Sequence, residues 1–137
     1  MKKKISILYK EKKSPVIYLG ISFLCLITFI IYNQFSHGVT SPFMTFLFCW
    51  PLILGFIPYL LLAVIPKAEY PDRLTLNVYN SGVAALTVSS LLKGIFDIAG
   101  NASIYQHYLM IFGTIMLIAG IIIYIRQVYL SRKNQII

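Results

Sequence analysis

The segment "LTLNVYNSGVAALTVSSLL" (Leu74–Leu92) decides how this chain folds, because it is long, mostly apolar and free of charged residues. The hydrocarbon core of a lipid bilayer is about 30 Å thick, and an α-helix rises about 1.5 Å per residue. Nineteen helical residues therefore cover about 28 Å. The segment predicts a membrane-spanning helix, which we expect to cover residues 74–98.

Three more apolar segments of similar length occur in the chain: "PVIYLGISFLCLITFIIY" (Pro15–Tyr32), "FMTFLFCWPLILGFIPYLLLAVI" (Phe43–Ile65) and "YLMIFGTIMLIAGIIIYI" (Tyr108–Ile125). The 137 residues are 58% hydrophobic and 12% charged, a composition typical of membrane proteins. We therefore expect an all-α membrane protein, a four-transmembrane-helix bundle in one domain over residues 15–126. Its helices are expected at about 15–33, 43–65, 74–98 and 105–126, with a basic segment before them (1–14) and a tail after them (127–137).

The basic residues predict the orientation of the bundle. Lysine and arginine near helix ends tend to stay on the cytoplasmic side of a membrane. Eleven of the twelve lie in the two terminal segments and in the middle connection: Lys2, Lys3, Lys4, Lys10, Lys12, Lys13, Lys67, Arg73, Arg126, Arg132 and Lys133. The connections "NQFSHGVTS" and "GNASIYQH" contain none. We expect both termini in the cytoplasm (N-in/C-in) and a multi-pass protein of the cell membrane.

The basic residues also indicate which kinds of partner the chain can bind. The net charge of +8 is dispersed around helix ends, which disfavours a nucleic-acid-binding surface. The basic N-terminal segment is instead suited to the anionic headgroups of the lipid bilayer. Lysine outnumbers arginine nine to three and isoleucine is abundant, which favours a low-GC bacterial origin.

Groups that carry catalysis or hold cofactors are few. Cys25 and Cys49 occur singly, and no nucleophile, nucleotide or zinc motif is found. His37, Asp97 and His107 are all predicted at the outer side, but their spacing fits no metal-ligand pattern. We expect no enzyme activity, no cofactor and no metal site.

The third helix carries polar and small residues on one face: Asn77, Asn80, Ser81, Ala84 and Thr87. Such a stripe should avoid lipid and contact another helix, either as structural hydrogen bonds or as the wall of a hydrated path.

The second helix contains Pro51 and Pro58, which free the carbonyls of Leu47 and Leu54. Because a short connection joins the second and third helices, we expect them to pack antiparallel. Their contact is a predicted polar seam made of Asn77, Asn80, Ser81, Thr87, Pro51 and Pro58. The freed Leu54 carbonyl should then lie near the depth of Ala84 to Thr87. There it can accept a hydrogen bond from Ser81 or Thr87, or the two helices can line a small hydrated cavity with Asn80 below it.

Two further sets of residues stand out. Lys93 and Asp97 lie one helical turn apart at the outer edge of the third helix, where they can pair at the membrane interface or contact a solute at an outer mouth. Gly113 and Gly120 recur at a seven-residue interval in the fourth helix and predict a close-packing face. Their neighbour is either the first helix or the fourth helix of a second copy, so a homo-oligomer remains open.

The small size and the lack of catalytic motifs favour a non-catalytic accessory subunit that binds another membrane protein. A small oligomeric transporter or channel, with a polar path between the second and third helices, is the alternative.

The charge pattern gives a first testable prediction. A reporter that is active only in the cytoplasm should be active when fused after Ile137 and inactive when inserted near Gly38, because basic residues flank the first position and not the second. Activity of a periplasm-only reporter at Ile137 would contradict the predicted orientation.

Overall fold

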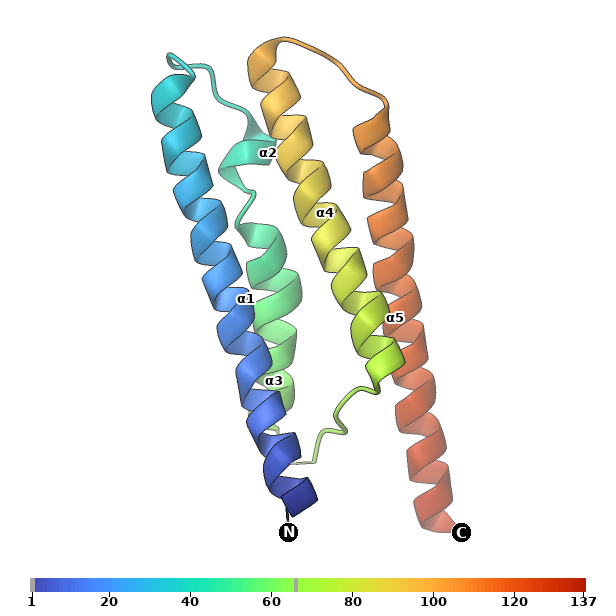
Figure 1. The fold of residues 1–137 in the computed structure, drawn as a ribbon. Helices are drawn as coiled ribbons and strands as arrows, with labels where there is room; N and C mark the ends of the chain where they lie inside the picture. The colour runs from blue at the N-terminus through green and yellow to red at the C-terminus, as the bar shows by residue number, and fades with distance from the viewer. Residues whose placement is uncertain (1, 66) are drawn as a thin grey trace.

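The computed structural model describes residues 2–65 and 67–137, and the side chains of residues 13–65 and 67–137. The described residues are helical apart from short connections, and no strand occurs among them. In chain order the helices are α1 (Lys2–Phe35), α2 (Pro42–Thr45), the π-helix η1 (Trp50–Phe56), α3 (Ile57–Val64), α4 (Arg73–Ala99) and α5 (Tyr105–Ile136) (Figure 1).

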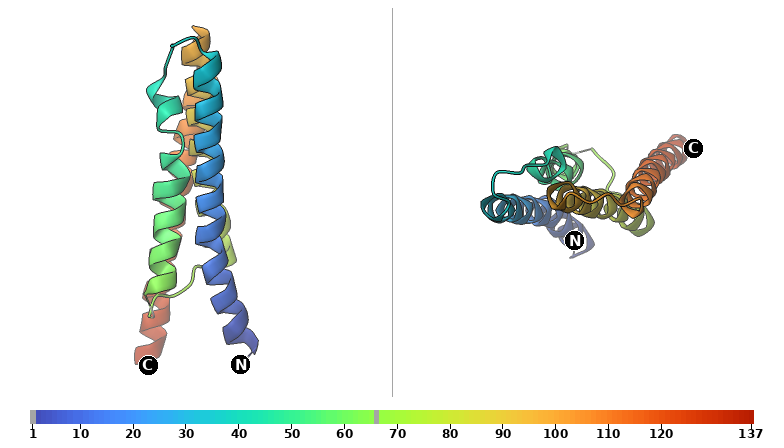
Figure 2. Two further views of the ribbon diagram at one scale, coloured as in Figure 1. Left: turned by 90° about the vertical axis from the view of Figure 1, so that its left-hand side faces the viewer. Right: turned by 90° about the horizontal axis from the view of Figure 1, so that it is seen from above.

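The central helix is α4. It packs against α5 on one side and against α2 and η1 on another, while α1 packs against η1 and α3. Seen from above, α4 lies between α1 and α5, and the chain from α2 to α3 lies to one side of this row (Figure 2). The helices thus form an open arrangement, and part of the surface of α4 stays uncovered.

Three helices are long and apolar enough to cross a membrane: Lys13–Phe35 within α1, α4, and α5. Large apolar side chains point outward along them, for example Phe23 at 64% exposed and Ile122 at 60% exposed. So much exposed apolar surface is unfavourable in water and suits contact with lipid. The structure is therefore that of an all-helical membrane protein.

The segment expected as one helix over residues 43–65 is divided. α2 ends at Thr45, residues 46–48 form turns, and η1 and α3 follow as a shorter apolar helix, Trp50–Val64. Pro51 accounts for the break, because proline has no N–H and its ring clashes with the carbonyl four residues earlier. At about 1.5 Å per residue the Trp50–Val64 helix is about 22 Å long, less than the bilayer core.

Both termini and the connection between α3 and α4 lie at one end of the structure, which we call the basic end (Figure 1). The outer helices are longer than expected, since α1 begins at Lys2 and α5 ends at Ile136. Hydropathy marks where an apolar segment stops, whereas backbone hydrogen bonds continue through lysine and arginine, which favour helix. The predicted headgroup contacts of residues 2–12 lie outside the described side chains.

Glycines allow α4 and α5 to approach closely. A Cβ atom on Gly82 would lie 2.7 Å from the backbone nitrogen of Leu117 and 2.9 Å from the carbonyl oxygen of Gly113. A Cβ atom on Gly120 would lie 3.0 Å from Cα of Tyr79. The glycine face of α5 therefore packs on α4 of the same chain, a neighbour that the sequence did not indicate.

The close contact predicts that alanine is poorly tolerated at Gly82. Gly82→Ala should lower the free energy of unfolding by about 1–3 kcal/mol, because the new methyl group overlaps the backbone of α5. Gly20→Ala is the matched control, since a Cβ atom there meets nothing within 4 Å. Thermal unfolding of both variants in detergent measures the difference, and equal stability would contradict the close packing.

Candidate functional site

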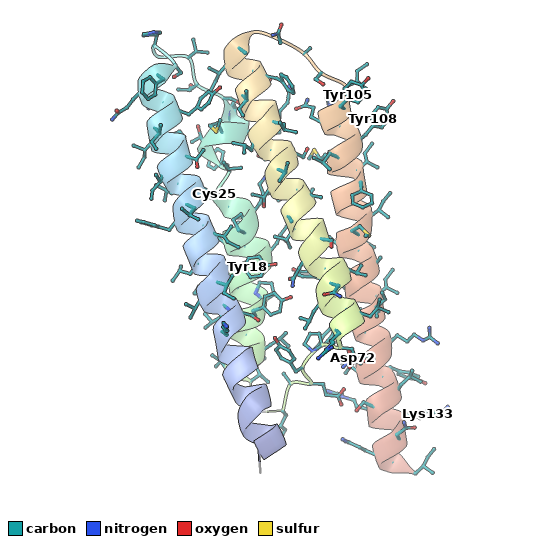
Figure 3. All side chains as sticks on the ribbon, viewed as in Figure 1. Tyr18, Cys25, Asp72, Tyr105, Tyr108 and Lys133 are labelled. Atoms are coloured by element: carbon teal, nitrogen blue, oxygen red, sulfur yellow. The ribbon has the colours of Figure 1, made fainter. Side chains whose placement is uncertain are left out.

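A cluster of tyrosines around Asn80 joins three helices. Oδ1 of Asn80 accepts hydrogen bonds from the hydroxyl of Tyr18 at 2.7 Å and from that of Tyr59 at 2.6 Å. The two tyrosine rings stack, with centroids 5.5 Å apart and planes inclined by 13°. Tyr18 comes from α1 (Figure 3), Tyr59 from α3 and Asn80 from α4. We call these residues, with Tyr79, the tyrosine–asparagine cluster.

The backbone of η1 makes room for this cluster. A Cβ atom on Gly55 would overlap the ring of Tyr18, so the ring packs directly on the helix backbone. The ring of Tyr59 meets that of Tyr79 edge to face, with centroids 6.3 Å apart. Tyr59 is only 4% exposed, and its hydroxyl therefore depends on Asn80 for a partner.

The carbonyl of Leu54, which Pro58 deprives of its helical N–H partner, accepts a hydrogen bond from the Tyr79 hydroxyl at 2.6 Å. We expected this bond to come from Ser81 or Thr87. The hydroxyls of both residues instead donate to carbonyls of their own helix, those of Asn77 and Val83. The bond does come from α4, as predicted, but from a face of that helix turned away from Ser81.

A groove with a volume of about 450 Å³ lies beside the cluster, between α1 and α4. Ser14 and Tyr18 line it from α1, Pro51 from η1, and Asn80, Ala84 and Thr87 from α4. We call it the α1/α4 groove. It brings together three residues of the predicted seam, Pro51, Asn80 and Thr87. Pro58 lines a different groove, between α3 and α5.

The remaining seam residues face outward. Asn77, Ser81 and Ala84 are exposed, as is Val88 at 46%. Intervals of four, three and four residues place these four side chains on one face of α4. We call this face the exposed α4 stripe, and nothing in the described part of the chain covers it.

Lys93 and Asp97 lie at the end of α4 farthest from the basic end. Their side chains form an ion pair with a distance of 2.8 Å between Nζ and Oδ1, and they are 30% and 29% exposed. Oδ2 of Asp97 also accepts a hydrogen bond from the hydroxyl of Ser41 at 2.8 Å. The Lys93 ammonium group lies 5.6 Å from the centre of the Phe43 ring. The pair therefore ties the start of α2 to α4.

Other reactive side chains are scattered. Among residues 13–65 and 67–137, no three histidine, cysteine, aspartate or glutamate side chains are grouped so as to hold a metal ion. His37 is exposed in the connection after α1, and Cys25 and Cys49 are free thiols.

The three tyrosines of the cluster were not predicted from the sequence. Each lies within an apolar segment, where a phenolic hydroxyl needs a partner that lipid does not offer. This requirement, set against the polar face of the third helix, is the signal that could have linked them to Asn80.

Comparison of the chain with protein-family models, with curated proteins and with solved structures found no match. The structure itself therefore defines the class: an all-helical membrane protein in which tyrosine and asparagine side chains hydrogen-bond between helices.

The cluster predicts unequal roles for the two asparagines of α4. Asn80→Ala leaves two tyrosine hydroxyls without their acceptor and should lower the free energy of unfolding by about 1–3 kcal/mol. Asn77→Ala is the matched control, because Asn77 is exposed and its effect should stay under about 0.5 kcal/mol. Thermal unfolding in detergent compares the two variants. Equal losses would show that the hydrogen bonds to Asn80 contribute little.

Proposed function

We propose that the protein is a small non-catalytic subunit of a bacterial cytoplasmic membrane that binds a helix of another membrane protein. The observation that supports this proposal best is the exposed α4 stripe, made of Asn77, Ser81, Ala84 and Val88. A helix face directed at lipid alone usually carries large apolar side chains, as α5 does with Ile111, Ile115 and Ile122. The side chains of the stripe are smaller than these isoleucines, and those of Asn77 and Ser81 are polar.

The geometry of the stripe suits a helical partner. Small side chains at intervals of three and four residues let a second helix approach closely, and exposed polar groups can hydrogen-bond across such a contact. At about 1.5 Å per residue, Ser81 and Ala84 lie roughly 12–17 Å along α4 from Arg73, within the membrane-crossing part of the helix. The α1/α4 groove beside the stripe gives the partner's side chains further room.

The proposal includes four membrane crossings, with both termini in the cytoplasm. This topology is supported by the basic residues with described side chains. Lys67 and Arg73 border the connection between α3 and α4, and Lys13, Arg126, Arg132 and Lys133 lie toward the terminal ends of α1 and α5. Lys93 alone among the described lysines and arginines lies at the other end, paired with Asp97. The second crossing would use the Trp50–Val64 helix together with α2 and the turn between them, because that helix alone is too short for the bilayer core.

A small oligomeric transporter or channel is the second candidate, and the polar lining of the α1/α4 groove supports it. Asn80 and Thr87 give this groove two hydrogen-bonding side chains. A path between η1 and α4 has less support, because Pro51 of η1 and Val83 of α4 are both fully buried. A transport path would therefore run along α1 and α4, with a second copy completing its wall.

A photoreactive amino acid at position 84 tests partner binding in native membranes. We expect irradiation to join Ala84→benzoylphenylalanine to one membrane protein in a discrete band. The matched control is Ile115→benzoylphenylalanine, since Ile115 is 60% exposed on α5 and should label lipid alone. Lipid adducts at both positions would contradict the proposal, and a cross-link between two copies of the chain would favour the oligomeric alternative.

Thiol labelling separates the two candidates. In a variant with Cys25 and Cys49 replaced by alanine, a cysteine at Thr87 should resist a small water-borne thiol reagent if the groove receives lipid or a helix. Rapid labelling of Thr87→Cys, prevented by an added solute, would support transport instead.

A further inference from the structure

A second groove, with a volume of about 370 Å³, lies between α3 and α5. Apolar side chains form most of its walls, including Leu62 of α3, Leu76 of α4 and Ile121 of α5. Its volume falls within the range of about 300–1,000 Å³ that small-molecule sites occupy. We call it the α3/α5 groove.

One polar group in this groove lacks a partner. Thr75 lines the groove and is 3% exposed, and its hydroxyl makes no hydrogen bond to the described residues. A buried hydroxyl normally has a partner, because leaving it unpaired costs about 1–3 kcal/mol. Thr75 belongs to the first turn of α4, at the basic end, so an acceptor that reaches it lies near the membrane interface.

The groove continues into a polar pocket at the basic end. This pocket has a volume of about 630 Å³, and Ile65 and Tyr124 line both spaces. Its wall contains two cationic side chains, Lys67 and Arg132. It also contains the amide of Gln135 and one carboxylate, that of Glu69. Two cations against one anion favour a negatively charged ligand.

Hydrogen bonds fix the wall that these spaces share. The Tyr124 hydroxyl donates to the carbonyl oxygen of Glu69 at 3.0 Å. The Gln127 amide nitrogen donates to the carbonyl oxygen of Tyr70 at 3.1 Å, and its amide oxygen accepts from the backbone nitrogen of Asp72 at 3.0 Å. The connection between α3 and α4 is thus held against α5, so the pocket and the groove keep their relative positions.

We infer that the pocket and the α3/α5 groove together bind one anionic phospholipid. Its phosphate lies against Lys67 and Arg132, and one acyl chain lies along Leu62, Leu76 and Ile121. The Thr75 hydroxyl oxygen is covered by the protein, and rotation of this side chain into the groove lets it donate a hydrogen bond to an ester carbonyl. The two cations, the hydroxyl and the apolar wall match the phosphate, the ester group and the acyl chain of a phospholipid. This site lies at a different groove from the one assigned to a partner helix, so either can fail without the other.

The lipid preference is tested with the full-length protein in detergent. We expect phosphatidylglycerol to be retained about tenfold better than phosphatidylcholine in native mass spectrometry, because each basic side chain near a headgroup favours the anionic lipid. The double variant Lys67→Gln with Arg132→Gln should lose this preference. The matched control is Arg126→Gln with Lys133→Gln, which removes the same charge from exposed residues of α5 outside the pocket.

A second pair of variants tests whether the α3/α5 groove holds the acyl chain. Ile121→Trp fills the groove and should reduce retention of phosphatidylglycerol about tenfold. Ile122→Trp, at a neighbouring exposed residue outside the groove, should leave it unchanged. Equal retention by all variants, or equal retention of the two lipids by the unmodified protein, would overturn the inference. So would a photoreactive residue at position 121 that cross-links to a polypeptide and not to phospholipid.

Discussion

One amide oxygen connects most of this structure. Oδ1 of Asn80 accepts hydrogen bonds from Tyr18 and Tyr59, and so joins α1 and α3 to the central helix. In water such bonds compete with solvent and contribute little, but in hydrocarbon an unpaired hydroxyl has no alternative partner. Apolar side chains do not replace this contact, because lipid solvates them as well as a neighbouring helix does. Specific pairing of α1 and α3 with α4 therefore depends on polar groups.

The other side of α4 is held by a different means. Gly82, Gly113 and Gly120 let the backbones of α4 and α5 approach, and close packing replaces hydrogen bonding along this contact. At the basic end, Tyr124 and Gln127 add bonds from α5 to the connection before α4. Hydrogen bonds thus hold α1 and α3 to α4, and close packing holds α5 to it. The face of α4 between α1 and α5 has neither kind of contact with the described residues. This uncovered face carries the stripe on which the proposed partner contact rests.

Much of the local structure could be predicted from the sequence, whereas the choice of neighbours could not. Hydropathy and length identified the helix around Leu74–Leu92, and helical periodicity alone placed Lys93 next to Asp97. The same periodicity identified Gly113 and Gly120 as one face of a helix but carried no information on which helix lies against it.

The hydrogen-bond partners that were missed depend on the rotation of one helix relative to another. The Leu54 carbonyl is bonded by Tyr79 and not by Ser81 or Thr87. The reason is that α4 turns the side that carries Tyr79 toward η1. The division of the second apolar segment depends on how the chain continues past Pro51, and a proline in a transmembrane helix is compatible with either a kink or a break. Hydropathy does not distinguish these outcomes.

The position of Asn80 in the chain has a consequence for biosynthesis. The acceptor follows Tyr18 by 62 residues and Tyr59 by 21 residues, so the ribosome completes the first two apolar segments before their shared partner has been made. In the proposed topology of four crossings, those segments enter the bilayer with phenolic hydroxyls that only a later segment satisfies. Their final association is therefore postponed until the third segment leaves the translocation machinery, and a chain truncated before residue 80 would expose unsatisfied groups that quality-control proteases of the membrane can recognise.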